Sequence, residues 1–191
     1  LNYSGLQAKQ LIDELGLPYE KVIVSTFDID TRAHPQYFAR LSECYFNHPS
    51  PTRASYQPIA LYHNNIWQSD PISRLVANST SFWLLTELAR SDRLFTFSSH
   101  SMSFKALVEI GFWNKDIVTE DSRIFLQCFF RYEGDYRVEP MYIPVYMNTV
   151  NSGSFWTAVA DQYKQMRRWA WGIENQTILP RVFYFSLNLD F

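Results

Sequence analysis

The feature of this sequence that most constrains its fold is a short run of β-branched and aromatic residues, KVIVSTF, at positions 21–27. The run is continuous instead of alternating, which is typical of a strand covered on both faces. Residues 4–15 before it carry leucines at helical spacing, and Gly16 and Pro18 mark the end of that helix. A helix followed by a buried strand is typical of an α/β domain.

The same signals predict the remaining elements. Helices are expected from Pro35 onward and over 71–90, 101–111, 119–134 and 154–172, and strands over 56–62, 93–99 and 136–147. The prolines of the last strand suit an edge or irregular position. No internal repeat, low-complexity tract or linker divides residues 1–191, and 47% of them are hydrophobic, so we expect one domain with a sizeable core.

Composition excludes several classes of protein. The formal net charge is −2 and the basic residues are scattered, which does not indicate a nucleic-acid partner. Cys44 and Cys128 form no CxxC pattern, so we expect buried thiols in a reducing compartment instead of a disulfide. No apolar run approaches the roughly 18 residues that would span a bilayer.

Two aspartates, Asp28 and Asp30, follow the strand at 21–27 with one residue between them. In an extended chain, positions i and i+2 point the same way, so both carboxylates would face one spot at the carboxyl end of a strand, where α/β sheets bind ligands. Two like charges at one spot repel each other, and a hard divalent cation relieves this repulsion. The alternative is a solvated turn, in which aspartate is common.

A second acidic pair, Glu120 and Asp121, follows Thr119 at the predicted start of a helix. The helix macrodipole stabilises a carboxylate there by about 0.3–1 kcal/mol, which by itself accounts for acids at this position. In the other interpretation one acid is a general base that deprotonates a hydroxyl. That role needs a carboxylate close to the nucleophile in a partly desolvated site.

Helical periodicity places side chains of the two long predicted helices on separate sides. In the first, Ile72, Leu75, Val76, Ser79, Phe82, Trp83 and Leu88 lie roughly along one side. In the second, the expected core stripe consists of Phe155, Val159, Met166, Ala170 and Ile173, and the adjacent stripe of Asp161, Gln165, Arg168 and Gly172, with Trp169 at the border. A guanidinium suits phosphate oxygens and a flat aromatic ring suits the apolar face of a sugar, so the adjacent stripe is a candidate binding face. The alternative is an ordinary amphipathic helix.

Two histidines lie near these motifs. His34 follows the aspartates closely and is a candidate ligand, although a histidine at a turn or helix start is the commoner situation. His100 precedes the helix over 101–111, whose free N–H groups can meet an anion or an acceptor hydroxyl.

The order and spacing of the motifs resemble those of one known family. A buried strand that ends in DxD is followed about ninety residues later by a helix that opens with ED, and about forty-five residues later by the QxxRW motif. This series, from Lys21 to Gly172, resembles the inverting family-2 glycosyltransferases of the cellulose-synthase, hyaluronan-synthase and ceramide-glucosyltransferase type. The segment FSSHSMSFKALVEIGFW at 97–113 also resembles the loop and helix before the TED motif of that family.

The resemblance implies an α/β fold of the GT-A type, a Rossmann-like mixed sheet flanked by helices. It implies an inverting, metal-dependent transfer of a hexose from a nucleotide sugar to a hydroxyl. Asp30 would then ligate Mg²⁺ or Mn²⁺ on the donor diphosphate, with Asp28 as second ligand or ribose-side partner. Asp121 would be the general base, and Glu120 would support the site.

The other motif residues are implied to bind the two substrates. Gln165 and Arg168 would neutralise the departing diphosphate, while Trp169 and His100 would contact the acceptor. The implied partners are a nucleotide-sugar donor and a saccharide or lipid acceptor of polysaccharide or glycolipid biosynthesis.

In this family the units that hold base and ribose lie upstream of the DxD strand, and processive members have flanking membrane helices. The chain starts one helix before that strand and turns apolar at its end. We therefore expect a partial domain with its N-terminal nucleotide-binding part truncated, in a full-length protein embedded at the cytoplasmic face of a membrane.

Two competing hypotheses remain, and the first of them uses the same acids. A metal-dependent phosphoryl-transfer enzyme or hydrolase has no use for an aromatic ring beside the guanidinium, and the sequence has no phosphate-cradling Gly-rich loop. A non-catalytic carbohydrate-binding module would suit the twelve tyrosines and six tryptophans but needs no paired acids at a strand end.

Overall fold

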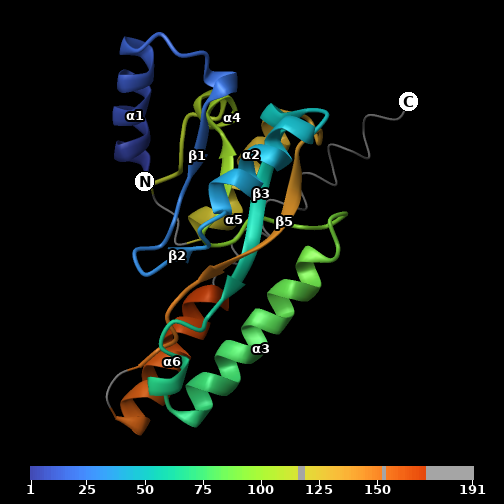
Figure 1. Cartoon of the computed structure of the whole chain (residues 1–191). Coiled ribbons are helices and arrows are strands. Elements are labelled where there is room, and N and C mark those ends of the chain that lie inside the picture. Colours follow the sequence, from blue (N-terminus) through green and yellow to red (C-terminus); the bar gives the residue numbers. More distant parts are fainter. Residues whose placement is uncertain (116–118, 152–153, 171–191) are drawn as a thin grey trace, which may run out of the picture.

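The computed structural model describes residues 1–115, 119–151 and 154–170. Its strands form one five-stranded sheet in the order β1-β4-β3-β5-β2: β1 (Ile23–Ser25), β2 (Arg32–Ala33), β3 (Ala54–Leu61), β4 (Ser101–Ser103) and β5 (Arg137–Tyr146). The helices are α1 (Asn2–Glu14), α2 (Tyr37–Asn47), α3 (Pro71–Leu88), α4 (Phe104–Glu109), α5 (Glu120–Arg131) and α6 (Phe155–Ala170). Figure 1 shows α3 and α6 side by side at one end of the molecule, with α1 on the opposite side beyond β1.

The directions of the strands determine where a ligand can bind. β3 runs parallel to β5, and β4 runs antiparallel to both β1 and β3. The strands β1, β3 and β5 therefore point the same way, so that their carboxyl ends meet at one edge of the sheet. The chain that enters β4 arrives at the same edge.

The last predicted strand is irregular, as its prolines indicate, but it is not at the edge. β5 lies between β3 and the two-residue strand β2. Its register against β3 shifts between the pairs Gln57–Pro140 and Ile59–Pro144, so both prolines flank the irregularity. Proline lacks the N–H that a regular ladder requires, which accounts for this position.

Two clusters of buried side chains hold the helices on the sheet. The first packs α2 against β3 and β5 and includes Tyr37, Leu41, Tyr56, Met141 and Val145. The second packs α4 and α5 beside β4 and includes Met102, Phe104, Leu107, Ile124 and Tyr136. Cys44 and Cys128 are buried free thiols, as the sequence predicts.

The two long helices do not bury the apolar sides expected from the sequence. α3 packs through Ser73, Ala77, Ser81, Leu84 and Leu88. Of the expected side only Leu88 is buried, while Leu75 and Phe82 are 68% and 69% exposed. The small side chains allow the helix to approach the sheet closely and gain dispersion contacts, so that volume outweighs hydropathy in selecting the packed face.

The same reversal occurs in α6 and α1. α6 buries Ala158 and Gln162, whereas Phe155 and Met166 of the expected core stripe are exposed, and Ile173 lies outside the described residues. α1 leaves its leucines exposed and packs through Gly5, where a Cβ atom would lie 2.6 Å from a ring carbon of Phe112. Glycine permits this close approach.

The strand predicted over 93–99 is wrong. This segment has no regular structure and leads into β4. Its polar atoms bond to side chains from other elements instead of to a neighbouring strand; the N–H of Phe97, for example, donates to Oε1 of Gln57 at 3.0 Å. Among the described residues, no helix combines the length and hydropathy needed to cross a membrane.

Candidate active site

A cleft of about 620 Å³ lies at the edge of the sheet where β1, β3 and β5 end. Seven of the eight site residues expected from the sequence line it: Asp28, Asp30, Glu120, Asp121, Gln165, Arg168 and Trp169. These residues come from three chain segments more than forty positions apart, and the sheet and α6 bring them together. His34 is not among the residues that line the cleft.

Asp28 and Asp30 reach the cleft from a turn, not from the strand itself. β1 ends at Ser25, and the N–H of Thr31 donates to the carbonyl of Asp28 at 2.9 Å. Two separate segments hold the carboxylates. Ser98 Oγ donates to Oδ2 of Asp28 at 2.5 Å, and the N–H of Asn148 donates to Oδ2 of Asp30 at 2.9 Å. The extended geometry expected from the i, i+2 spacing is therefore wrong, although both side chains line the cleft.

Asp121 lies in the first turn of α5 with its side chain 32% exposed. Burial is the main cause that raises the pKa of its carboxyl from 3.8 to about 7, and the neighbouring carboxylates of Glu120 and Asp28 contribute to the same rise. A carboxyl with this pKa changes protonation near neutral pH, which suits a group that accepts a proton during a reaction.

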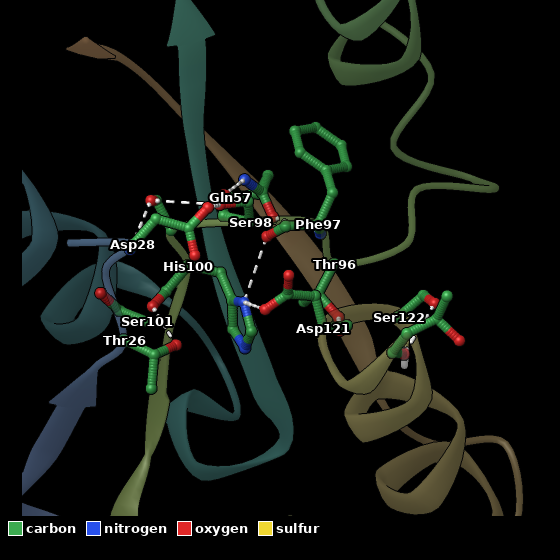
Figure 2. Close-up of polar contacts among 12 residues, drawn as sticks. Thr26, Asp28, Gln57, Thr96, Phe97, Ser98, His100, Ser101, Asp121 and Ser122 are labelled. Carbon is green, nitrogen blue, oxygen red and sulfur yellow. Dashed lines mark hydrogen bonds and ion pairs between the residues drawn. The ribbon is translucent and has the colours of Figure 1, made fainter. Parts of the chain in front are cut away.

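His100 is 1% exposed and is not among the residues that line the cleft, and Figure 2 shows its ring beside the carboxyl of Asp121. Its Nδ1 atom is 3.2 Å from the carbonyl oxygen of Phe97 and 3.9 Å from Oδ1 of Asp121. Burial lowers the pKa of the imidazole to about 4, so the ring is neutral at neutral pH. This position leaves it no open surface for contact with an acceptor.

α6 presents Gln165, Arg168 and Trp169 to the cleft. The stripe proposed for binding thus faces the cleft, whereas Phe155 and Met166 of the stripe proposed for the core are exposed. The Trp169 ring lies 6.1 Å from that of Tyr62 between centroids, with planes at 45°.

Tyr62 was missed by the sequence reasoning, as was Asn148. Tyr62 directly follows β3, and Asn148 lies two residues beyond β5. Burial, with a contribution from the carboxylates of Asp28, Asp30 and Asp121, raises the pKa of the Tyr62 hydroxyl to about 12, so this ring lies close to all three acids. A polar or aromatic residue just beyond the carboxyl end of each parallel strand is the signal that would have found them.

The aspartate pair offers carboxylate oxygens to a divalent cation. Asp28 and Asp30 both line the cleft, and each makes its hydrogen bond through Oδ2. The described part of the chain contains no group of three or more histidine, cysteine or acidic side chains that could hold a metal. Mg²⁺ commonly takes only one or two carboxylates and completes its shell with substrate phosphates and water, so the pair fits such an ion.

The comparison with known families agrees with this geometry. Residues 23–189, most of the chain, match the model of glycosyl transferase family group 2, and the chain belongs to this family. The protein is therefore a glycosyltransferase, its curled mixed sheet flanked by helices is of the GT-A-like type, and the family generally uses divalent cations. No curated protein and no solved structure matches the chain.

Proposed function

We propose that this domain transfers a hexose from a nucleotide sugar to an acceptor hydroxyl with inversion at the anomeric carbon. The observation that carries the proposal is that Asp121, a half-buried carboxyl with a pKa near 7, shares one cleft with the Asp28–Asp30 pair and with Arg168. A proton acceptor, two acids suited to a cation and a phosphate-binding cation are the groups that such a transfer needs.

In the proposed step, the acceptor hydroxyl oxygen attacks the anomeric carbon while Asp121 takes its proton. The bond from the anomeric carbon to the phosphate oxygen breaks, and its electron pair leaves with the nucleoside diphosphate. A single displacement of this kind inverts the configuration. Because burial gives the Asp121 carboxylate a higher proton affinity than an exposed aspartate has, it is suited to act as the base.

The negative charge of the leaving diphosphate needs compensation. Asp28 and Asp30 would hold Mg²⁺ or Mn²⁺, which when bound supplies positive charge to the diphosphate oxygens. Arg168 offers a planar guanidinium for the same oxygens, and Gln165 beside it on α6 offers amide donors.

The acceptor would lie against Trp169 and Tyr62. Their rings line the cleft together with the carboxyl of Asp121, and a sugar packs its apolar face on aromatic rings. This arrangement supports a saccharide or glycolipid acceptor.

We also propose that the full-length protein works at the cytoplasmic face of a membrane. α3 exposes Leu75 and Phe82, and α6 exposes Trp156 and Met166, a pattern of large apolar side chains outside the cleft that suits contact with a lipid surface. Cosedimentation with anionic phospholipid vesicles tests this, and equal binding by a Phe82→Ser/Trp156→Ser variant would contradict it.

Donor turnover by the full-length protein tests the catalytic proposal. We expect sugar transfer that stops with EDTA and returns with excess Mg²⁺ or Mn²⁺. The Asp121→Asn variant should bind the donor as the wild type does but lose more than nine-tenths of the transfer rate. Retention of more than a tenth of the activity would show that another group is the base, and transfer in EDTA would contradict the role of the cation.

Family membership disfavours the two alternatives. Release of phosphate from a nucleotide without transfer of sugar would instead favour phosphoryl transfer or hydrolysis. Binding of oligosaccharide without donor turnover would favour a carbohydrate-binding module.

A further inference from the structure

One irregular segment, Thr96–His100, connects the two acidic parts of the cleft (Figure 2). It lies between the turn that carries Asp28 and the first turn of α5 that carries Asp121. Its residues contact both of these turns, and the proposed transfer step does not involve these contacts.

On the side of the aspartate pair, the contacts fix Asp28. Ser98 Oγ donates to its carboxylate at 2.5 Å, and Ser99, which has a positive φ of 64°, lies with its Oγ 3.5 Å from the N–H of Asp28. Gln57 anchors the segment from within the sheet: it is fully buried, accepts from the N–H of Phe97 at 3.0 Å and donates to the carbonyl of Ser98 at 3.4 Å.

On the other side, two contacts reach Asp121. Thr96 is 1% exposed, and its Oγ1 donates to the backbone carbonyl of Asp121 at 2.5 Å. The imidazole of His100 lies against the carboxyl itself, with Nδ1 3.9 Å from Oδ1. The first turn of a helix is prone to fray, so Asp121 depends on such contacts for a defined position.

The tautomer of His100 follows from its partner. A carbonyl oxygen only accepts hydrogen bonds, so Nδ1, at 3.2 Å from the oxygen of Phe97, carries the proton. The Nε2 atom is then an acceptor, and it is buried with no hydrogen-bond partner in the described part of the chain. A neutral ring beside Asp121 can orient the carboxyl. Because it carries no charge, it forms no ion pair with the carboxylate and so does not reduce the proton affinity of Asp121.

We propose that His100 is a positioning residue that, together with Thr96, holds the carboxyl of Asp121 in its orientation toward the cleft. The carbonyl oxygen of Phe97 accepts a hydrogen bond from Nδ1 and so fixes the ring, and the ring lies against Oδ1 of Asp121. This inference rests on the proposed function, because it assumes that Asp121 is the base. It replaces the expectation that His100 contacts the acceptor.

Steady-state kinetics of the full-length protein test the inference. We expect His100→Leu, which retains most of the volume, to lower kcat at least tenfold with the KM for donor and for acceptor within twofold of wild type. His100→Asn should recover kcat to within about threefold of wild type, because its amide nitrogen can donate to the carbonyl of Phe97 from nearly the position of Nδ1. Combined with Asp121→Asn, His100→Leu should cause no further loss.

Thr96 provides an independent test if the His100→Leu variant does not fold. Thr96→Val keeps the shape and removes the donor to Asp121, so kcat should fall severalfold, and Thr96→Ser should retain more activity than Thr96→Val. A kcat of His100→Leu equal to that of the wild type overturns the inference. If His100→Leu does not fold, an unchanged kcat of Thr96→Val overturns it instead. A raised acceptor KM with normal kcat in His100→Leu also overturns it, in favour of acceptor contact.

Failure of the proposed function has a different signature. In that case the wild-type protein shows no sugar transfer, or Asp121→Asn remains active. A different result would reject only the positioning role and leave the proposed function intact. In that case the wild type is active and Asp121→Asn is inactive, while His100→Leu and Thr96→Val are as active as the wild type.

Discussion

His100 and Asp121 lie 3.9 Å apart between Nδ1 and Oδ1, yet they do not form an ion pair near neutral pH. Burial lowers the pKa of the histidine to about 4 and raises the pKa of the aspartic acid to about 7. Between these two values both groups are neutral, because the charged form of each is the one that burial disfavours. Their closeness therefore serves orientation and not charge compensation.

The first prediction concerns the pH dependence of transfer. A base must be deprotonated to act, so kcat/KM should rise with pH and reach half its maximum near pH 7, well above the ordinary pKa of an aspartic acid. A bound cation lowers this midpoint, since it offsets the repulsion from Asp28. Initial rates from pH 4 to 9 at saturating Mg²⁺ measure it. A half-maximum at or below pH 4.5 would contradict the assignment of Asp121.

The second prediction concerns stability, with opposite signs for the two residues. The folded-state pKa of Asp121 is raised above 3.8, so its contribution to stability is lost as pH rises from about 4 to 7. At pH 8 the free energy of unfolding of Asp121→Asn should therefore exceed that of the wild type by about 1–2 kcal/mol, once the partial exposure of the side chain is allowed for. Near pH 4 the two free energies should be equal.

The folded-state pKa of His100 is lowered below 6.5, so stability is lost as pH falls from about 6.5 to 4. In the wild type this loss of unfolding free energy should be on the order of 3 kcal/mol, because the group is fully buried. The His100→Asn variant, which has no imidazole to protonate, should not show it. Urea unfolding of both variants at pH 4.5, 6 and 8 checks the signs. Parallel pH curves for wild type and either variant would show that the pKa of that residue is not shifted.

The third prediction compares two adjacent arginines on α6. Arg168 lines the cleft, whereas Arg167 is not among the lining residues and is exposed. Arg168→Ala should lower kcat by about 10- to 100-fold and weaken inhibition by the product nucleoside diphosphate, since the leaving group loses a charge-assisted hydrogen bond. Arg167→Ala is the matched control and should stay within twofold of wild type. Equal losses in both variants would point to a general effect of charge.

The fourth prediction compares two tryptophans on the same helix. Trp169 lines the cleft beside Tyr62, whereas Trp156 is 76% exposed near the start of α6. Trp169→Ala should raise the acceptor KM about tenfold with little change in the donor KM, because stacking on a sugar contributes about 1–2 kcal/mol. With a water-soluble saccharide acceptor, for which contact with a lipid surface has no role, Trp156→Ala should leave both KM values as they are. A donor KM that rises instead would place Trp169 on the donor side.

The sequence alone singled out most of the side chains that we propose for the site and that the structure brings to one cleft. Two acids after a buried strand, an acidic pair at a helix start and a Gln-Arg-Trp face at i, i+3 and i+4 are local patterns, and the structure has seven of the eight predicted residues along one cleft. Local spacing carries this information because the helical repeat decides which side chains share a face, whatever the helix packs against.

The tertiary structure decided which faces are buried and how the acids are held. Phe82 and Met166 are as apolar as core residues, yet they are exposed. Ser81 and Ala158 pack inward because their small size lets helix and protein approach closely, and Gln162 is buried on the same face of α6 as Ala158. The segment 93–99 alternates like a strand, yet Gln57, Asp28 and Asp121 take up its hydrogen bonds. These partners lie 25 to 70 residues away along the chain, and no pattern within a helix or a strand encodes contacts over such separations.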